Sequence, residues 1–244
     1  IIAGLTALYL IGPYLYLGYP KLEGISMWIV ISVIPVSIIT GFTASLMGRV
    51  ILYIIRKKRK MKTKFQKIIY IVISGLIVAA LAVLVDSRAL GSGKEIMITT
   101  LFTSDKSIEW YIPVVRIVGQ IISFCVGASG GIFAPSLSAG ASIGAFFAGL
   151  FQLTATESNL MILCGMVGFL TGITRSPFTS SILVIEMTNS HIIIFPLMMT
   201  ALIANIVAGY VSKRSFYDNL KVRYINEIYE EELNKTKEQL KSIP

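Results

Sequence analysis

Three long apolar runs occupy most of the first 85 residues and restrict what this chain can fold into. They cover residues 1–17, 26–55 and 68–85, and the only charged residue among them is Arg49. A run of about 20 apolar residues is long enough to cross the ~30 Å hydrocarbon core of a bilayer as a helix. Across the whole chain, apolar residues make up 55%, charged residues 14%, and the mean hydropathy is +0.76. We therefore expect an all-α polytopic membrane protein. The composition excludes a disordered chain and disfavours an ordinary water-soluble enzyme.

The later part of the chain has shorter apolar segments that are cut by glycine and proline. They cover residues 96–102, 111–126, 132–153, 160–173, 178–187 and 192–211. Several are too short to cross a bilayer, so they predict broken helices. Broken helices persist in a membrane only where protein buries them or where they line a cavity. Such segments point to a transport site. By contrast, the run 26–55 is longer than the bilayer core, and we expect it to tilt or to bend at Pro35.

Positive charge is concentrated in one loop. The chain carries a net charge of +9, and the stretch from Arg56 to Lys67 holds eight basic residues and no acid. Apolar segments flank this loop and Phe65 is the only aromatic residue in it, so nucleic-acid binding is disfavoured. The positive-inside rule instead places the loop in the cytoplasm, where it can meet anionic lipid headgroups.

The sharpest local feature is the glycine-rich stretch from Gly127 to Pro135, GASGGIFAP. Proline suits the first turn of a helix, so we expect a helix to begin near Phe133, inside the membrane. The free N–H groups and the positive dipole of such a helix end can bind an anion. The alternative is a re-entrant turn that only packs closely. A similar break ends at Pro177, and Tyr217 lies at the start of the last helix, either as an interface anchor or as an O–H donor to an anion.

Two stretches carry a resemblance to a known family. GASGGIFAPSLSAGASIGAFFAG and GFLTGITRSPFTSSILVIEMTNSHIIIFPLMMTALIANIVA resemble, in order and spacing, the CLC family of chloride channels and chloride/proton exchangers. The resemblance runs from about residue 1 to residue 225. It implies an inverted-repeat fold with broken, re-entrant helices, of which this chain covers the last helix of the first half and the whole second half. It also implies a homodimer with one pore in each subunit.

The resemblance further implies an anion-binding site. The backbone N–H groups of Ile132 and Phe133 would coordinate a chloride ion, Gly131 would permit the turn, and the hydroxyl of Tyr217 would donate to the same ion. Chloride would be the transported ligand, with no cofactor and no catalytic residue. The family's GSGIP-like turn and its G-[KR]-E-G-P gating glutamate are not found, and GSGKE at residues 91–95 does not match. The exchangers' internal proton-transfer glutamate would fall upstream of residue 1.

These features together predict chloride transport, and we favour chloride/proton antiport over a passive voltage-gated-type channel. Nitrate and fluoride stay open as alternative anions. We expect a transmembrane domain over residues 1–217 and a cytoplasmic helix or tail over residues 218–244, in a bacterial inner-membrane protein. Because the chain opens at Ile1 inside an apolar run, without a basic leader, we expect its start to lie within a longer protein and not in a signal peptide.

A remote alternative is a rhomboid-like intramembrane serine protease. Ser129 would be its nucleophile, and His191 is the only histidine that could act as its base. The sequence around His191 lacks the Ala-His-x-x-Gly pattern, which disfavours this interpretation.

The remaining polar and small residues have structural interpretations. We expect Arg116, Arg175 and Glu186 to bond within the protein and not to the ion, and His191 to lie in a solvated loop. The pairs Gly140/Gly144 and Gly168/Gly172 have the small-xxx-small spacing that lets helices approach closely, and we expect them to pack within one subunit. Cys125 and Cys164 lie in apolar stretches as free thiols, and no group of residues has metal-ligand spacing.

Overall fold

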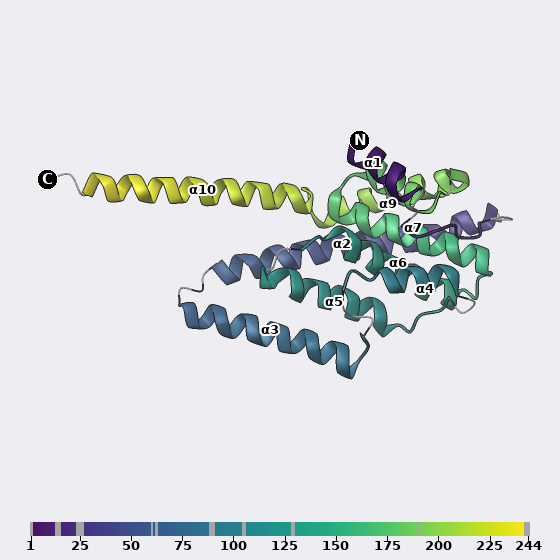
Figure 1. The fold of residues 1–244 in the computed structure, drawn as a ribbon, viewed down its shortest axis with the longest axis horizontal. Coiled ribbons are helices and arrows are strands. Elements are labelled where there is room, and N and C mark those ends of the chain that lie inside the picture. The colour runs from purple at the N-terminus through teal and green to yellow at the C-terminus, as the bar shows by residue number, and fades with distance from the viewer. Residues whose placement is uncertain are drawn as a thin grey trace.

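A computed structural model describes residues 2–12, 16–22, 27–59, 61, 63–87, 91–103, 106–127, 130–189 and 191–241 of the chain. Over these residues the protein is helical and contains no strand, as the apolar runs predict. The helices are α1 (Ile2–Ile11), α2 (Met27–Arg59), α3 (Lys64–Leu84), α4 (Lys94–Phe102), α5 (Tyr111–Val126), α6 (Phe133–Leu150), α7 (Ala155–Thr174), α8 (Pro177–Thr188), the short 3-10 helix η2 (His191–Ile193), α9 (Ile194–Val211) and α10 (Phe216–Lys241). Figure 1 shows how they are arranged.

By length, some of these helices can span a membrane and others are too short to do so. Among the described residues, five helical stretches are long and apolar enough to cross a membrane: Ile29–Arg59, Lys64–Leu84, Phe133–Leu150, Ala155–Thr174 and His191–Val211. α4 and α8 have only 9 and 12 residues, so the prediction of segments too short to span is confirmed. α2 runs for 33 residues with Pro35 inside it.

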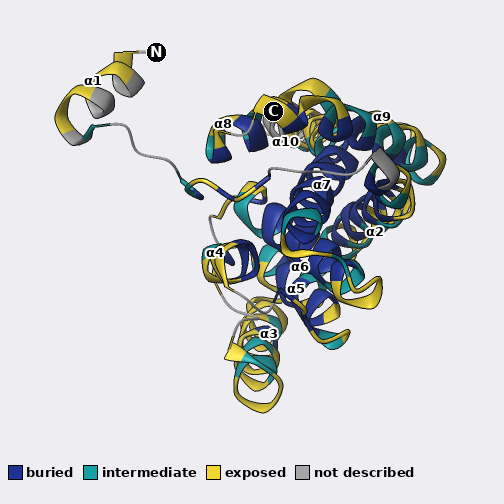
Figure 2. Cartoon of the chain, turned by 90° about the vertical axis from the view of Figure 1, so that its right-hand side faces the viewer, coloured by how far each residue is buried: buried dark blue, intermediate teal, exposed yellow. Residues whose placement is uncertain are grey.

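The core lies between α6 and α7, which cross with very small residues at the contact. A Cβ atom added at Gly140 would lie 2.2 Å from the carbonyl oxygen of Gly165, and one added at Gly144 would lie 2.5 Å from that of Met161. α7 is buried along almost its whole length, with α2 and α9 against its other side, as the dark blue helices in Figure 2 show. The prediction that this glycine pair packs within one chain is confirmed.

The second glycine pair brings α7 against α2. A Cβ added at Gly168 would meet the hydroxyl of Thr40 at 2.2 Å, and one added at Gly172 would meet the Cβ of Ala44 at 2.6 Å. The pair Gly168/Gly172 therefore also packs against a helix of the same chain.

The first apolar run does not form the single span that we expected. α1 ends at Ile11, and Gly12 follows with a φ of +83°, a left-handed conformation that ends the helix. Residues 16–22 instead run along the bundle without helical structure, where Leu17 and Leu22 are buried and the N–H of Leu17 donates to the carbonyl of Met187 at 3.1 Å. Figure 2 shows α1 standing apart from the bundle.

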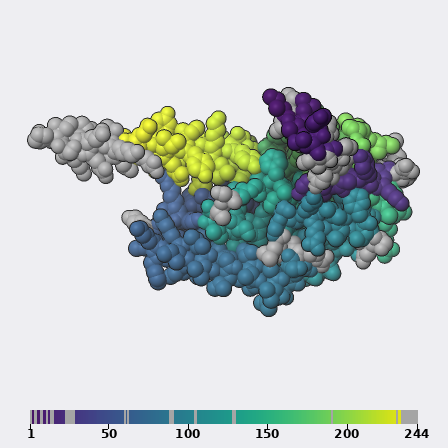
Figure 3. Space-filling view, viewed as in Figure 1, coloured from purple at the N-terminus to yellow at the C-terminus, as the bar shows by residue number. Residues whose placement is uncertain are grey.

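α10 leaves the bundle as a long projecting helix (Figure 1). It begins at Phe216, two residues before the expected start of the tail, so Tyr217 belongs to its first turn. Phe216 is buried and Leu220 packs against the same core cluster, whereas the later apolar residues Ile225 and Ile228 are exposed. Figure 3 shows α10, in yellow, at the same end of the molecule as the blue surface of α3.

Candidate functional site

The N-terminal end of α6 has no side-chain cap and no acidic residue in its first turn. The helix begins at Phe133, as predicted, and its first backbone hydrogen bond runs from the N–H of Ser136 to the carbonyl of Ile132 at 3.0 Å. Helix geometry leaves the N–H groups of Phe133 and Ala134 without an intrahelical acceptor. The N-cap residue is Ile132, whose side chain cannot accept a hydrogen bond, and the first turn contains no Asp or Glu. The positive end of the helix dipole is therefore uncompensated.

Tyr217 lies beside this helix end. Its ring centroid is 6.3 Å from that of Phe133, and the two side chains are 42% and 41% exposed. Partial burial raises the pKa of the Tyr217 phenol above its usual value. A tyrosine hydroxyl is protonated at neutral pH even without such a shift, so it is a donor there. The structure thus brings together two elements that lie about 85 residues apart in the sequence.

The start of α10 is fixed by packing and by a side-chain cap. Phe216 is 4% exposed, and its ring centroid lies 5.5 Å from that of Phe124 on α5. The hydroxyl of Ser215 accepts from the N–H of Asp218 at 3.0 Å and donates to the carboxylate of Asp218 at 2.6 Å. These contacts hold the first turn of α10, and Tyr217 with it, against the bundle.

The glycines of the stretch 127–131 have different roles. Gly127 caps α5 with a φ of +88°, which a residue with a side chain rarely adopts. Gly131 has no such positive φ, and a Cβ added there would meet nothing within 4 Å. Of the glycines in this stretch, only Gly127 therefore has a left-handed conformation. Ala128 and Ser129 lie outside the described residues.

A cavity of about 120 Å³ lies directly behind the N-terminus of α6. Its lining includes Gly130, Gly131 and Pro135 on one side and Arg116 and Gln120 of α5 on the other. Arg116 is 3% exposed and donates to the carbonyl of Gly91 at 3.3 Å and to the hydroxyl of Ser138, which fits the structural interpretation of this arginine.

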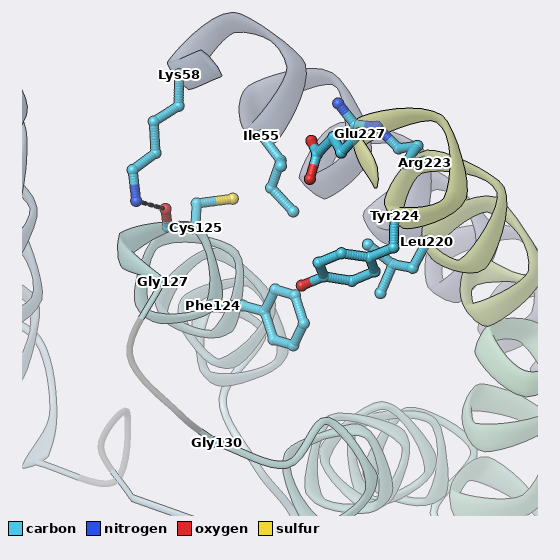
Figure 4. Close-up of a pocket in the computed structure, with 10 residues that line it drawn as sticks. All are labelled: Ile55, Lys58, Phe124, Cys125, Gly127, Gly130, Leu220, Arg223, Tyr224 and Glu227. Atoms are coloured by element: carbon cyan, nitrogen blue, oxygen red, sulfur yellow. Dashed lines mark hydrogen bonds between the residues drawn. The ribbon is translucent and has the colours of Figure 1, made fainter. Parts of the chain in front are cut away.

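A larger pocket of about 350 Å³ lies where the ends of α2 and α5 meet α10 (Figure 4). The side chains of Phe124 and Tyr224 point into it. Lys58 donates to the carbonyls of Cys125, at 3.1 Å, and Val126, and its positive charge suits the C-terminal end of α5. Phe124 and Gly130 line both this pocket and the smaller cavity.

α10 is tied to the basic end of α2. Arg223 donates to the carbonyl of Leu52 at 3.1 Å, and Arg59 forms ion pairs with Glu227, at 3.5 Å, and Glu230. The basic loop and the C-terminal helix therefore lie on one side of the bundle.

Arg175, Glu186 and His191 do not line the cavity behind α6. Arg175 caps α7 in a left-handed conformation, with a φ of 60°, and donates to the carbonyl of Ser212 at 3.4 Å. Glu186 lies near the C-terminal end of α8, and His191 lines a separate pocket with Tyr19 and Thr156. Among the described residues, no three His, Cys, Asp or Glu side chains come together as a metal site.

Sequence reasoning did not identify Gln120 or Phe124 as site residues. Gln120 is a polar residue inside the apolar segment 117–122, and that contrast is the signal that could have marked it. Phe124 is one apolar residue among many, so only its place in the lining of both cavities sets it apart.

Comparisons with known proteins agree with this architecture. The profile of a family described as "Voltage gated chloride channel" matches residues 1–209. Two relatives named "H(+)/Cl(-) exchange transporter ClcA", from Salmonella arizonae and Salmonella newport, are each 30% identical over 145 residues. Each alignment covers 57% of this chain and 31% of the relative.

Two solved structures share the fold. One, titled a CLC-type fluoride/proton antiporter, is similar with a TM-score of 0.73 at 20% identity, over 89% of this chain and 52% of that one. The other, titled a slow cyanobacterial Cl−/H+ antiporter, has a TM-score of 0.63 at 21% identity, over 86% of this chain and 50% of that one. This chain thus spans about half the length of the structures and less than a third of the curated relatives that it matches.

Proposed function

The chain belongs to the voltage-gated chloride channel family, and from that premise we propose that the protein exchanges chloride for protons across a membrane. The proposal concerns the activity of the full-length protein, of which this chain provides the part that contains α6 and α10. The observation that carries it is the uncapped N-terminus of α6, which lies beside Tyr217 within the fold of this family.

The anion site that we propose consists of Gly131, Ile132, Phe133 and Tyr217. The backbone N–H groups of Ile132 and Phe133 bind the chloride ion, and the Tyr217 hydroxyl donates to it from the side of α10. Partial charges suit a transported ion, because a site without a full cation attracts an anion and still releases it.

Proton coupling is supported by the relatives. Both ClcA proteins are named exchange transporters, and both solved structures are titled antiporters. A passive channel is the outcome to test against, because the family profile that matches the chain is described as a chloride channel. The protease alternative has no support in these comparisons.

We also propose how the chain is oriented in the membrane and which oligomer the protein forms. Residues 1–217 belong to the transmembrane domain, residues 218–244 to a cytoplasmic helix or tail, and the basic loop 56–67 lies on the same cytoplasmic side. The ion pairs of Arg59 with Glu227 and Glu230 support a shared side. The inner membrane of a bacterium is the proposed location. A homodimer is proposed from the family, and exposed apolar side chains such as Phe178 and Phe195 leave α8 and α9 with surface for a second copy or for lipid.

Calorimetric titration of chloride into the full-length protein in detergent tests the site. Tyr217→Phe keeps the ring that contacts Phe133 and removes only the hydroxyl. A hydrogen bond to a charged group contributes about 1.5–3 kcal/mol, so we expect the chloride Kd to rise at least about tenfold. Tyr224→Phe, on the same helix but in the pocket of Figure 4, is the matched control and keeps wild-type affinity. Wild-type affinity in Tyr217→Phe contradicts the role of the hydroxyl.

A further inference from the structure

Gln120 has a buried amide oxygen with no protein partner. The side chain is 9% exposed, and its Oε1 atom makes no hydrogen bond to any described residue. A buried acceptor without a donor costs free energy, and such atoms in native proteins are usually satisfied by ordered water. Gln120 lines the 120 Å³ cavity behind α6, which is large enough for several water molecules.

The orientation of this amide follows from its neighbours. The Nε2 atom of Gln120 lies 3.4 Å from the hydroxyl of Ser136 and 3.5 Å from the carbonyl of Ile132. The Ser136 hydroxyl donates its own proton to the Ile132 carbonyl at 2.6 Å, so it can only accept from Gln120. The amide nitrogen therefore faces α6, and the oxygen is left as the acceptor without a partner.

The charges around the cavity select the donor for that oxygen. Arg116 contributes a positive charge, the α6 N-terminus contributes the positive end of its dipole, and no described lining residue is Asp or Glu. These surroundings disfavour a cation such as ammonium or hydronium. Arg116 lines the same cavity but makes no hydrogen bond to this oxygen, so a neutral water molecule is the donor that fits. The second hydrogen of that water is free to point toward an anion at the α6 N-terminus.

We propose that the cavity holds ordered water, and that a water molecule bridges the Gln120 amide oxygen and the transported anion. This inference rests on the proposed function. It assigns to Gln120 the control of how much of its hydration shell the anion keeps while it is bound. Gln120 acts through that water and is a positioning residue. A retained water favours chloride and fluoride over weakly hydrated anions such as nitrate.

The test compares anion selectivity in two variants of the full-length protein. Gln120→Met keeps the length of the side chain and removes the acceptor. We expect the ratio of nitrate to chloride affinity, measured by calorimetric titration of each anion, to rise about tenfold, the effect of losing one hydrogen bond to a charge. Asn159→Leu is the control, because Asn159 also has a buried, unpartnered amide oxygen but lies outside the lining of this cavity. Its ratio should stay at the wild-type value.

The outcomes separate a failure of this inference from a failure of the proposed function. A wild-type ratio in Gln120→Met, or an equal shift in Asn159→Leu, overturns the inference. Absence of chloride binding in the wild-type protein overturns the proposed function itself. If Gln120→Met does not fold, a wild-type structure at about 2 Å resolution decides: water within hydrogen-bond distance of the Gln120 oxygen supports the inference, and a dry cavity overturns it.

Discussion

The close backbone contact between α6 and α7 at Gly140 allows a quantitative test of the fold. At Gly140, an added Cβ would lie 2.2 Å from the carbonyl oxygen of Gly165 and 2.8 Å from the Cα of Met166. Ordinary van der Waals contact begins at about 3.4 Å, so α6 and α7 would have to separate by roughly 1.2 Å to accept Gly140→Ala. Both obstacles are backbone atoms, which cannot move aside by changing a rotamer.

The expected cost follows from two opposing effects. Overpacking a close-packed core costs about 1–3 kcal/mol, and a contact between backbones belongs at the upper end of that range. Replacing glycine by alanine inside a helix returns about 1 kcal/mol through helix propensity. We therefore expect Gly140→Ala to lower the free energy of unfolding by about 2 kcal/mol.

Thermal unfolding of the full-length protein in detergent, followed by circular dichroism, measures the effect. The matched control is Gly75→Ala on α3, where an added Cβ meets nothing within 4 Å and helix propensity alone acts. Gly75→Ala should unfold at or above the wild-type temperature, and Gly140→Ala clearly below it. Equal stability of the two variants would refute the claim that α6 and α7 touch at these glycines.

Two further predictions concern the start of α10. Burial raises the pKa of Tyr217, so its O–H is present at low and neutral pH and is lost only as pH rises through that raised pKa. Chloride affinity should therefore be independent of phenol ionisation up to pH 9 and should fall only above about pH 10; a fall in wild-type affinity near pH 8 that Tyr217→Phe abolishes would contradict this. Ser215→Ala removes the cap that accepts from the N–H of Asp218, and we expect about 1 kcal/mol lower stability by thermal unfolding. Ser215→Thr keeps the hydroxyl and should restore most of that stability, and equal melting of all three proteins would show that the cap contributes nothing.

Much of the fold could be predicted because its signals are local. Proline and glycine fix helix ends through a single residue's backbone, so the starts of α6 near Phe133 and of α8 at Pro177 follow from the sequence. The small-xxx-small spacing similarly predicts the α6–α7 contact at Gly140. The run 1–17 was predicted wrongly because its apolar residues outweighed the helix-ending signal of Gly12.

The site was harder to predict because its geometry is tertiary. No local pattern in the sequence brings Tyr217 close to Phe133. The family resemblance implied that both residues bind the same ion, and the structure places their ring centroids 6.3 Å apart. The unpartnered oxygen of Gln120 depends on where α5 meets α6, and on the bond that Ser136 makes, so it is visible only in three dimensions. The sequence also does not show which glycine of the stretch 127–131 takes a left-handed conformation, because several neighbouring glycines could each adopt it, and the structure has it at Gly127.

The central claim is coupled transport of chloride and protons. Liposomes that contain the full-length protein, loaded with chloride and monitored with a chloride electrode and a pH electrode together, test it most directly. The account predicts that chloride moving down its gradient drives protons against theirs, and that Tyr217→Ala weakens this coupling while the protein stays folded. Chloride flux without proton movement would contradict the antiport proposal and make the protein a channel, and the absence of any anion flux would contradict the transport function as a whole.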